Sequence, residues 1–556
     1  MQNVTGNVVD GNWISGISAV DNSRLGPQDN LPKFLAYNKG RNVYYFLPFL
    51  LGILGMIFHF KRGKMDFYSV LIMFIFTGVL VVIYLNQPPM EPRERDYTNV
   101  GSFQTFCIWI GLSVLFMVDL LKKYINKSTA AVGATVVALL AAPVLMGSQN
   151  WDDHDRSGRF LGISFAKNYL NSCEKDAILF TNGDNDTYPL WYAQNVEGVR
   201  TDVRVINLSL LPTEWYSSAL RRKVFDSEPL PLSIPAEKLV SGKRDYVRYF
   251  DNGKFDQNKV YQLTEVLDYM TDNDQSKMQR TQNGDLVNVF PVMNYSVDID
   301  KSAVINSGIV PNKDTASIVD KLVWNIGRSG LSKGDIVVLD IIATNAKTGW
   351  KRPIYWTTTT GSSVYLNLDK YLRHNGLTYQ LIPVEANQRM RGMDDMDLLY
   401  GRLMNDYVWG NMDKGTLNLD DKAQLVPQNL RSLFVQIADY YSNTGKLDSA
   451  VNLVDKCFAS MPESILPMNL RLKAASAEIY YKANQMEKGD KMLNEVGEDA
   501  AELVRYYRKF KTRGLQSVEG DKRDNLEVVK NVGQTAARYQ RTDMAKKFEA
   551  LYNQLN

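Results

Sequence analysis

The sequence predicts a multi-domain membrane protein with four transmembrane helices, followed by a mixed α/β domain and by C-terminal α-helical tetratricopeptide-like repeats. Three observations carry this prediction. Four apolar runs fall within the first 146 of the 556 residues. Between residues 147 and 400, short β-branched runs alternate with helical patterns, and from residue 428 the pattern is helical to the end. A chain of this length exceeds what one hydrophobic core supports, so several domains are expected.

The composition excludes several classes of protein. The formal net charge is only +3, which is not the basic footprint of a nucleic-acid-binding protein, so no nucleic-acid partner is expected. The three cysteines show no CxxC spacing, and the three histidines are scattered along the chain. Neither a zinc site nor a disulfide framework is therefore indicated, and no metal or cofactor is predicted.

The four apolar runs define a predicted transmembrane domain at 43–146, and they cover residues 43–60, 67–85, 103–121 and 129–146. Each is about as long as the roughly 17–25 residues that a helix needs to cross hydrocarbon. Asp119 is the charged exception, and it lies near the end of its run, where it can reach the headgroups. Buried helices of a soluble core are the alternative, but four such runs so close together are typical of a membrane protein.

The basic residues of the short loops predict the orientation in the membrane. Loops 61–66 and 122–128 carry three basic residues each, whereas loop 86–102 has two arginines that are offset by three acidic residues. Because basic loops stay in the cytoplasm, the first and third loops are predicted to face inward. The segment 1–42, the second loop and everything after residue 147 would then lie on the outer side.

The region 147–400 is predicted to be a mixed α/β domain. Apolar, β-branched runs predict strands at 177–181, 203–211, 335–344 and 353–359. The first two of them, joined by a helix near 188–196, form a predicted βαβ crossover. Residues 226–300 are charged and weakly periodic, and they are interpreted as an irregular insertion.

The C-terminal region 428–556 is predicted to be helical throughout. Residues 431–464 fit the helix–turn–helix repeat called tetratricopeptide, because small Ala438 and Ala450 would let two helices approach while Phe434 and Tyr441 fill the space between repeats. An ordinary helical bundle is the alternative. Repeat arrays of this kind commonly bind partner chains in a concave face.

Three polar clusters are candidates for function, and the first lies in the predicted outer loop 88–97. Arg93 and Arg95 carry planar donor forks that suit phosphate oxygens, and their place at the membrane boundary suits a lipid phosphate. The alternative is that Glu91 or Glu94 pairs with one of the arginines on an ordinary loop.

The second cluster is 150-NWDDHDRSGRF-160, directly after the fourth apolar run. Trp151 suits an anchor at the membrane interface. Asp152, Asp153, His154 and Asp155 could supply a base or metal ligands. Alternatively, the aspartates cap the next helix, which is predicted over 159–170.

The third cluster is Asp184-Asn185-Asp186, which follows the predicted strand 177–181. Many enzymes that use nucleotide-sugars hold a divalent metal with such a triplet, but nucleotide-sugars are cytoplasmic and the predicted orientation places this triplet outside. The alternative is that Asp184, Asp186 and Thr187 satisfy the free N–H groups of the helix that follows. The turn could also contribute polar groups to an acceptor or sugar pocket at the carboxyl end of the strand.

Several long motifs resemble those of a known family. The stretches 11-GNWISGISAVDNSRLGP-27, 91-EPRERDY-97, 150-NWDDHDRSGR-159 and 179-LFTNGDNDTYPLWYAQNVEGVRTDVRVINLSLL-211 strongly resemble the bacterial branch of a membrane protein O-mannosyltransferase-like family. Its animal relative is similar to the enzyme that O-mannosylates immunoglobulin-like domains of plexins. Members belong to the GT-C superfamily of glycosyltransferases, and the resemblance spans roughly residues 8–360.

The resemblance implies a glycosyltransferase function at the bacterial inner membrane, with the soluble bulk of the chain in the periplasm. Members take sugar from a polyprenyl-phosphate lipid and pass it to protein acceptors. Carried over to this sequence, Arg93 and Arg95 would contact the carrier phosphate. Asp96 and the segment containing Asp152, His154 and Arg156 would line the same membrane-edge cleft.

Family members are much longer, and their catalytic acidic residue lies in an outer loop that corresponds to no residue here. The chain therefore resembles the C-terminal half of the family, and a separate N-terminal half is an expected partner. The sequence assigns no catalytic residue, and Asp184 and Asp186 remain candidates on the acceptor or sugar side. The alternative function is a non-enzymatic membrane scaffold that binds periplasmic client proteins through its helical repeats.

Overall fold

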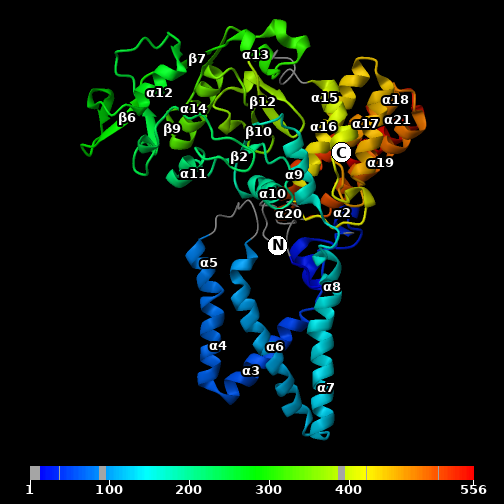
Figure 1. Cartoon of the computed structure of the whole chain (residues 1–556). Helices are drawn as coiled ribbons and strands as arrows, with labels where there is room; N and C mark the ends of the chain where they lie inside the picture. The colour runs from blue at the N-terminus through cyan, green and yellow to red at the C-terminus, as the bar shows by residue number, and fades with distance from the viewer. Residues whose placement is uncertain (1–12, 37, 87–94, 386–394, 421–422, 511) are drawn as a thin grey trace. The chain divides into compact units, whose positions relative to one another are not determined.

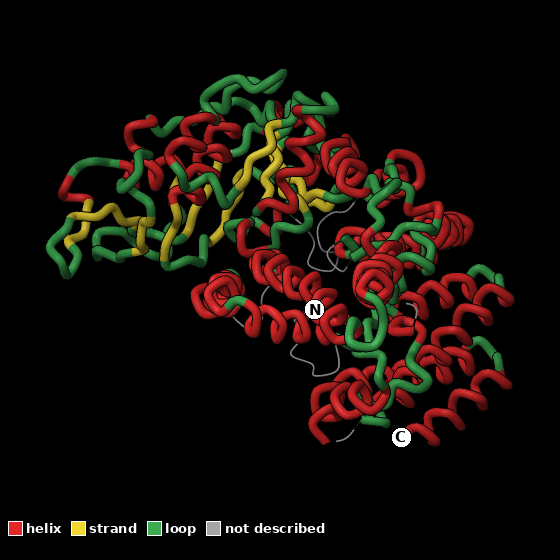
Figure 2. The backbone as a smooth tube through the Cα atoms, turned by 90° about the horizontal axis from the view of Figure 1, so that it is seen from below, coloured by secondary structure: helices red, strands yellow, loops and turns green. Residues whose placement is uncertain are grey.

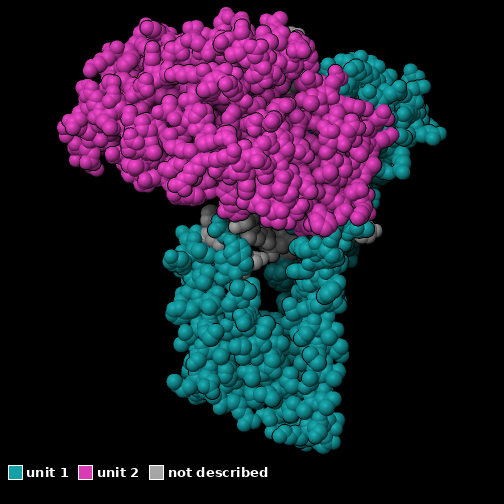
Figure 3. Space-filling view, viewed as in Figure 1, with its two compact units in different colours: residues 1–158, 415–451, 462–556 teal, residues 159–414, 452–461 magenta. Residues whose placement is uncertain are grey.

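The computed structural model describes the chain except for residues 1–12, 37, 87–94, 386–394, 421–422 and 511. The chain divides into two units (Figure 3). Unit 1 comprises Met1–Gly158, Gly415–Val451 and Pro462–Asn556, and unit 2 comprises Arg159–Lys414 and Asn452–Met461.

Unit 1 contains three helical stretches that are long and apolar enough to cross a membrane, namely Lys64–Leu85, Tyr97–Leu121 and Lys127–His154. They confirm three of the four predicted spans. Their parts are α4 (Lys64–Phe76), α5 (Val79–Leu85), η1 (Asp96–Asn99), α6 (Val100–Leu121), α7 (Lys127–Leu139), the π-turn η2 (Leu140–Val144) and α8 (Leu145–His154) (Figure 1).

The first predicted span forms helix α3 (Leu47–Arg62), whose 16 residues measure about 24 Å and fall short of an average hydrocarbon core of about 30 Å. Helix α3 nevertheless packs closely on α6. A Cβ on Gly55 would lie 1.7 Å from the carbonyl oxygen of Trp109, so only glycine permits this approach of the two backbones. On another side, Leu51 packs with Ala138 and Ala142.

An ion-paired cluster joins the loops at one end of these helices. The Asp119 carboxylate lies 2.6 Å from Arg62 Nη2 and 2.6 Å from Lys122 Nζ. Asp119 was expected to lie where it can reach the headgroups, and it pairs there with basic partners from the first and third loops. The two basic loops therefore meet at the same end of the helices, as the orientation argument requires of them.

The N-terminal segment of unit 1 packs on its C-terminal helices. This segment contains α1 (Ser18–Leu25) and α2 (Lys33–Ala36). Lys33 Nζ lies 2.8 Å from the Asp499 carboxylate, and Lys509 Nζ donates to the Asp29 carbonyl at 3.0 Å. This N-terminal segment is therefore held in part by residues that lie several hundred positions later in the chain.

The C-terminal region is helical, as predicted, and Figure 2 draws it as helices joined by loops. Its last four helices share a core that includes Leu493, Val496, Val529 and Phe548. The tetratricopeptide assignment stays a prediction. The helices, which range from 13 to 27 residues, are α16 (Leu425–Asn443), α17 (Leu447–Ser460), α18 (Leu470–Lys482), α19 (Met486–Tyr507), α20 (Thr512–Arg538) and α21 (Thr542–Leu555).

Unit 2 is built on a five-stranded sheet with the strand order β11-β12-β10-β1-β2. Strand β1 runs parallel to both of its neighbours, β2 and β10, while β12 is antiparallel to β10. The predicted βαβ crossover is confirmed, because α10 (Asp184–Asn195) joins β1 to β2. The strands are β1 (Ile178–Thr181), β2 (Arg204–Asn207), β10 (Ile354–Thr357), β11 (Leu372–His374) and β12 (Thr378–Leu381).

The strand predicted at 335–344 is wrong, because these residues lie in helix α14 (Lys333–Lys347). Ser332 and Asp335 form a capping box that starts this helix. Nearly the whole helix is buried in the main core of unit 2, so its sequence reads as a continuous apolar run without helical periodicity. A continuous apolar run does not distinguish a buried helix from a buried strand.

The segment 226–300, interpreted as irregular, is also ordered. It contains α12 (Leu263–Thr271) and short strands that pair over long distances, which explains its weak periodicity. Two small sheets result, with the orders β5-β6-β3-β9 and β4-β7-β8. Their strands are β3 (Tyr246–Tyr249), β4 (Tyr261–Gln262), β5 (Met278–Arg280), β6 (Leu286–Phe290), β7 (Asn294–Asp298), β8 (Lys321–Asn325) and β9 (Gly330–Ser332).

The helix predicted over 159–170 is confirmed as α9 (Leu161–Asn171). The shorter helices of unit 2 are α11 (Glu214–Ala219), α13 (Lys301–Ser307) and α15 (Met396–Gly401), and the last continues into the π-turn η8 (Arg402–Asp406).

Candidate functional site

A line of polar side chains runs across the five-stranded sheet at the carboxyl ends of its parallel strands. Thr181 pairs with Asn207 across β1 and β2, and Thr357 pairs with Thr378 across β10 and β12. The N–H of Asn375, which directly follows β11, donates to the Thr378 carbonyl at 2.7 Å. We call these five residues the polar row.

The polar row lies on one face of the sheet and is sealed from solvent. Phe180 lies opposite Trp356 in the parallel pair of β1 and β10, so Thr181 and Thr357 follow in line. Since side chains alternate between the faces of a sheet, all five residues share a face. Each is no more than 1% exposed. Polar groups in such a position are costly to bury unless they are hydrogen-bonded.

The polar row coincides with the topological switch point of the sheet. From β1 the chain passes through α10 to β2 on one side, and it returns later to β10 on the other side. In open α/β sheets, ligands bind outside the carboxyl ends of the strands at this point. Thr181, Asn207 and Thr357 are the last residues of their parallel strands, so the row marks the expected position of a binding site.

Asp186 is the carboxylate that adjoins the polar row. It lies in the first turn of α10 and is half-buried. Thr357 Oγ1 donates to its carboxylate at 3.4 Å, and Thr359 Oγ1 donates to Thr357 Oγ1 at 3.2 Å. Burial raises the pKa of Asp186, against the opposing effect of hydrogen bonds from the two threonines and from the Asn182 N–H. Such a carboxyl group is suited to hold and release a proton or to bind a hydroxyl group.

The two ends of the polar row differ in their hydrogen bonding. At the β2 end, Thr187 Oγ1 donates to the Gly183 carbonyl at 2.7 Å and lies 2.7 Å from Thr181 Oγ1, while Asn207 Nδ2 donates to Thr187 Oγ1 at 3.0 Å. This end is a closed network that fixes the turn after β1.

At the β11 end, neither side-chain amide atom of Asn375 has a hydrogen-bond partner among the described residues. Arg373, two residues earlier on the same face, donates through Nη2 to Gln380 Oε1 at 2.7 Å, but its Nε and Nη1 have no such partner. Buried groups of this kind are rare in folded proteins, and they favour a functional interpretation of the row.

The capping interpretation of the aspartate triplet needs correction. Helix α10 begins at Asp184, so Asp184 and Asp186 lie inside its first turn, and the N-cap is Gly183 without a side-chain cap. Gly183 has a φ of 85°, which glycine adopts without strain. The aspartates can stabilise the positive end of the helix by charge. Asp184 is exposed, whereas Asp186 is turned toward Thr357.

The predicted residues of the second cluster lie at the end of α8 in unit 1. Asp153 accepts a hydrogen bond from Asn42 Nδ2 at 3.0 Å, and His154 Nδ1 lies 2.7 Å from its carboxylate. Asp152 and His154 are exposed, and exposed Arg156 donates to the Asp153 carbonyl at 2.8 Å. The aspartates do not cap the next helix, because α9 begins at Leu161 without a side-chain cap.

The remaining predicted residues belong to the loop before α6. Arg93 lies outside the described residues. Arg95 is the N-cap of η1, its carbonyl accepts a hydrogen bond from Thr98 Oγ1 at 2.8 Å, and Asp96 is the first residue of η1. The loop and the α8 cluster belong to unit 1, whereas Asp184 and Asp186 belong to unit 2. The membrane-edge cleft predicted for the loop and the α8 cluster, which did not include Asp184 and Asp186, stays a prediction. Within the described parts of the chain, no cluster of three His, Cys, Asp or Glu residues could hold a metal ion.

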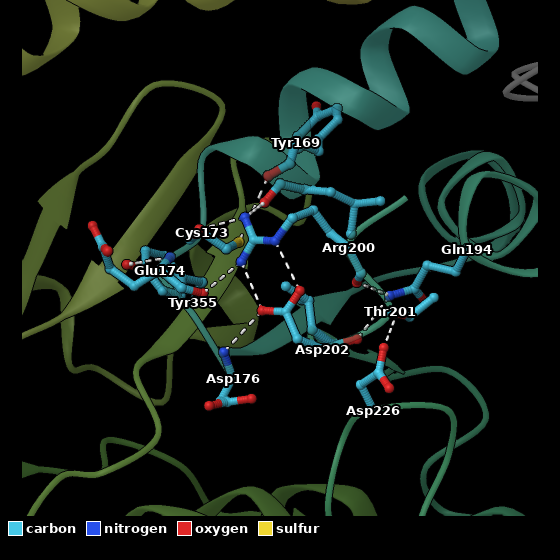
Figure 4. Close-up of polar contacts among 12 residues, drawn as sticks. Tyr169, Cys173, Glu174, Asp176, Gln194, Arg200, Thr201, Asp202, Asp226 and Tyr355 are labelled. Atoms are coloured by element: carbon cyan, nitrogen blue, oxygen red, sulfur yellow. Dashed lines mark hydrogen bonds and ion pairs between the residues drawn. The ribbon is translucent and has the colours of Figure 1, made fainter. Parts of the chain in front are cut away.

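Sequence reasoning missed Arg200. This residue organises the opposite end of the parallel strands, just before β2 begins (Figure 4). Its Nε and Nη2 bind the Asp202 carboxylate at 2.8 and 2.9 Å. Its remaining hydrogen bonds reach the carbonyl oxygens of Leu170, Cys173 and Glu174 at 2.9 to 3.0 Å. These five hydrogen bonds use all the donors of the guanidinium, so Arg200 tethers the end of α9 to β2 and leaves nothing for a ligand.

Comparison with known proteins relates this α/β region to one family. No curated protein and no solved structure matches the chain. Residues 162–399, which contain the polar row and Asp186, match the family described as TMEM260-associated domain 2, and TMEM260 is a protein O-mannosyltransferase-like family.

Proposed function

We propose that this chain takes part in protein O-glycosylation, in which a sugar passes from a polyprenyl-phosphate lipid to hydroxyl groups of periplasmic proteins. The observation that carries the proposal is the position of Asp186, a half-buried carboxyl group at the switch point of a sheet whose domain matches an O-mannosyltransferase-like family. The helices of unit 1 that are able to cross a membrane supply access to a lipid donor.

The chemistry assigns different roles to the two units. An acceptor hydroxyl attacks C1 of the sugar, its proton passes to a base, and the polyprenyl phosphate leaves. Arg93 and Arg95 stabilise the charge of this leaving group. Half-buried Asp186 binds hydroxyl groups of the acceptor or of the sugar, because a carboxylate is a partner that such groups need. The sealed polar row holds this carboxylate in place through Thr357. The base itself is assigned to no residue of this chain.

The contacts within unit 1 support four membrane crossings rather than three. If α3 did not cross, the segment before it and the helices after α8 would lie on opposite sides of the membrane. Lys33 and Asp499, which belong to these two regions, form an ion pair at 2.8 Å. The pair requires both regions to share one side, and this favours an even number of crossings. A thinner bilayer or flanking residues would accommodate the short helix α3.

The test is to measure glycans on periplasmic proteins in cells that carry single substitutions. Asp186→Asn and Arg95→Ala are each expected to reduce glycosylation at least tenfold while the chain remains in the membrane. Glu197→Gln, at an exposed position after α10, is the matched control and should leave glycosylation unchanged. Normal glycosylation in both Asp186→Asn and Arg95→Ala would leave the non-enzymatic scaffold as the better function.

Deletion of the C-terminal helices does not separate the enzyme from the scaffold. Helix α19 and the linker after it hold the segment that leads into α3, through contacts such as Lys33 with Asp499 and Phe510 against Gly26. A truncated chain would therefore lose the anchoring of its first helix together with any site for client proteins. Point substitutions avoid this ambiguity.

A further inference from the structure

Unit 2 contains a cavity that is separate from the polar row. It has a volume of about 240 Å³ and is lined by residues of α10, β2, α11 and the loop 220–227. Arg204, which lines it, is the first residue of β2, whereas Asn207 of the polar row is the last. The two features thus occupy opposite ends of the same strand.

Arg204 brings a positive charge to this cavity. Its side chain is only 5% exposed. It donates through Nε to Ser227 Oγ at 3.2 Å, and through Nη2 to the carbonyl oxygens of Arg222, Ser227 and Glu228 at 2.8 to 3.0 Å. Within the described residues Nη1 makes no hydrogen bond, so two N–H groups of the guanidinium remain available.

A second arginine strengthens the charge beside the same loop. Arg352 donates to Ser227 Oγ, to the Glu228 carbonyl and to the Asp176 carbonyl, each at 2.9 Å. Neither arginine forms an ion pair with any acid in the described chain. Burial and the charge of Arg352 lower the pKa of Arg204 to about 10, so Arg204 is still charged at neutral pH.

The walls of the cavity are mainly apolar and include flat aromatic rings. Trp191 of α10 and Tyr216 of α11 lie with ring centroids 6.4 Å apart, and Leu220, Val205 and Phe225 belong to the rest of the apolar lining. Aromatic walls bind the face of a planar or sugar ring. The unused donors of Arg204 suit an anionic group, which a guanidinium binds strongly.

We propose that this cavity binds a small molecule that carries one oxyanion group on a six-membered ring. The oxyanion accepts hydrogen bonds from the two free N–H groups of Arg204 Nη1, and the ring lies against Trp191 and Tyr216. A volume of about 240 Å³ holds one such ring with its substituents. This site is independent of the proposed glycosylation and of Asp186.

The experiment is isothermal titration calorimetry of the full chain in detergent, with detergent-only blanks. Benzoate and glucuronate are the anionic probes, because one carries an aromatic ring and the other a sugar ring. Their neutral analogues, benzamide and glucose, test the need for the oxyanion. We expect at least one anionic probe to bind at one site per chain, and its neutral analogue to bind at least tenfold more weakly.

Substitutions in the cavity wall test whether the probe binds in this cavity. They leave the arginines unchanged, which also hold the loop 220–227. Ala219→Phe fills the cavity from the end of α11, and Ala219→Ser is the matched control that keeps it open. Ala219→Phe should weaken the bound probe at least tenfold, while Ala219→Ser should leave its affinity within about twofold. The proposal fails if neither anionic probe binds saturably, if the neutral analogue binds equally well, or if Ala219→Phe binds like the wild type.

Discussion

The carboxyl group of Asp186 should lower the stability of the folded chain at neutral pH. Burial raises its pKa, so the folded state binds more protons than the unfolded state between the unfolded and folded pKa values. Stability is therefore lost as the pH rises through that window. We expect Asp186→Asn to raise the melting temperature at pH 7 while glycosylation is lost, as measured by thermal unfolding in detergent. A lower melting temperature would assign Asp186 a structural role.

Arg200 should raise the stability of the folded chain, in contrast to Asp186, because all of its donors form hydrogen bonds within the fold. Arg200→Ala removes its hydrogen bonds and leaves the Asp202 carboxylate unpaired, which should cost about 3 kcal/mol or more. Arg200→Lys should also destabilise unit 2, since an ammonium group cannot reproduce the planar fork. Urea unfolding measures both, and Arg248→Ala at an exposed arginine is the control. Equal stability of Arg200→Ala and Arg248→Ala would contradict the tether.

His374 should make unit 2 sensitive to acid. Burial lowers the pKa of His374 to about 4, from 6.5 in the unfolded chain. The unfolded state therefore binds more protons between these values, and the stability contributed by neutral His374 is complete above about pH 6.5 and is lost as the pH falls to 4. The loss should reach about 3 kcal/mol at pH 4. Unfolding free energies measured from pH 7 to 4 should fall less steeply for His374→Gln, and parallel curves would refute the assignment.

At the scale of elements, the sequence predicted those whose signal is local. The crossover of β1, α10 and β2 was found because apolar runs, turn residues and a helical stretch follow one another directly. Helix α14 was mistaken for a strand because it is buried on nearly every side, and the strands of 226–300 depend on distant partners. The prediction of element type thus failed where tertiary burial or long-range pairing overrides the local pattern.

The close contact of α3 and α6 gives a test of element packing that needs no knowledge of function. A Cβ on Gly55 of α3 would meet the carbonyl oxygen of Trp109 in α6. A Cβ on Gly111, which lies in α6 as Trp109 does, would meet nothing within 4 Å. Gly55→Ala should therefore destabilise the membrane helices by about 1–3 kcal/mol through overpacking. Gly111→Ala should be neutral or slightly stabilising, because it adds helix propensity. Thermal unfolding in detergent compares the two, and similar effects would show that α3 does not pack here.

At the scale of the whole molecule, the candidate site was predictable only in part. Asp186 was found from its own turn, because an acidic residue after an apolar strand is a local signal. The polar row was not found, since its members are scattered from Thr181 to Thr378 and meet only through strand register. A lone threonine at a strand end carries no functional signal. Only the pairing of five strands reveals a buried polar line that needs an explanation.

The orientation of the basic loops decides which side of the membrane the site occupies, and the number of crossings decides whether the N-terminal segment shares that side. Single cysteines at Lys33, Lys64 and Lys122, in a chain whose three natural cysteines are replaced, can be labelled in spheroplasts with an impermeant maleimide. With four crossings and basic loops inside, Lys33→Cys should label on intact spheroplasts, whereas Lys64→Cys and Lys122→Cys should label only after permeabilisation. The ion pair of Lys33 with Asp499 requires position 499 to share the side of position 33.

Each other labelling pattern has a definite meaning. If Lys33→Cys were protected while Asp499→Cys labelled from outside, α3 would not cross and the contact between the two residues would not exist in the membrane. If Lys64→Cys and Lys122→Cys labelled from outside and Lys33→Cys did not, the soluble part would face the cytoplasm. The lipid-carried sugar would then be on the wrong side for Asp186. Asp184 and Asp186 would instead meet nucleotide-sugars, and a divalent metal on their diphosphate would become the chemistry to test.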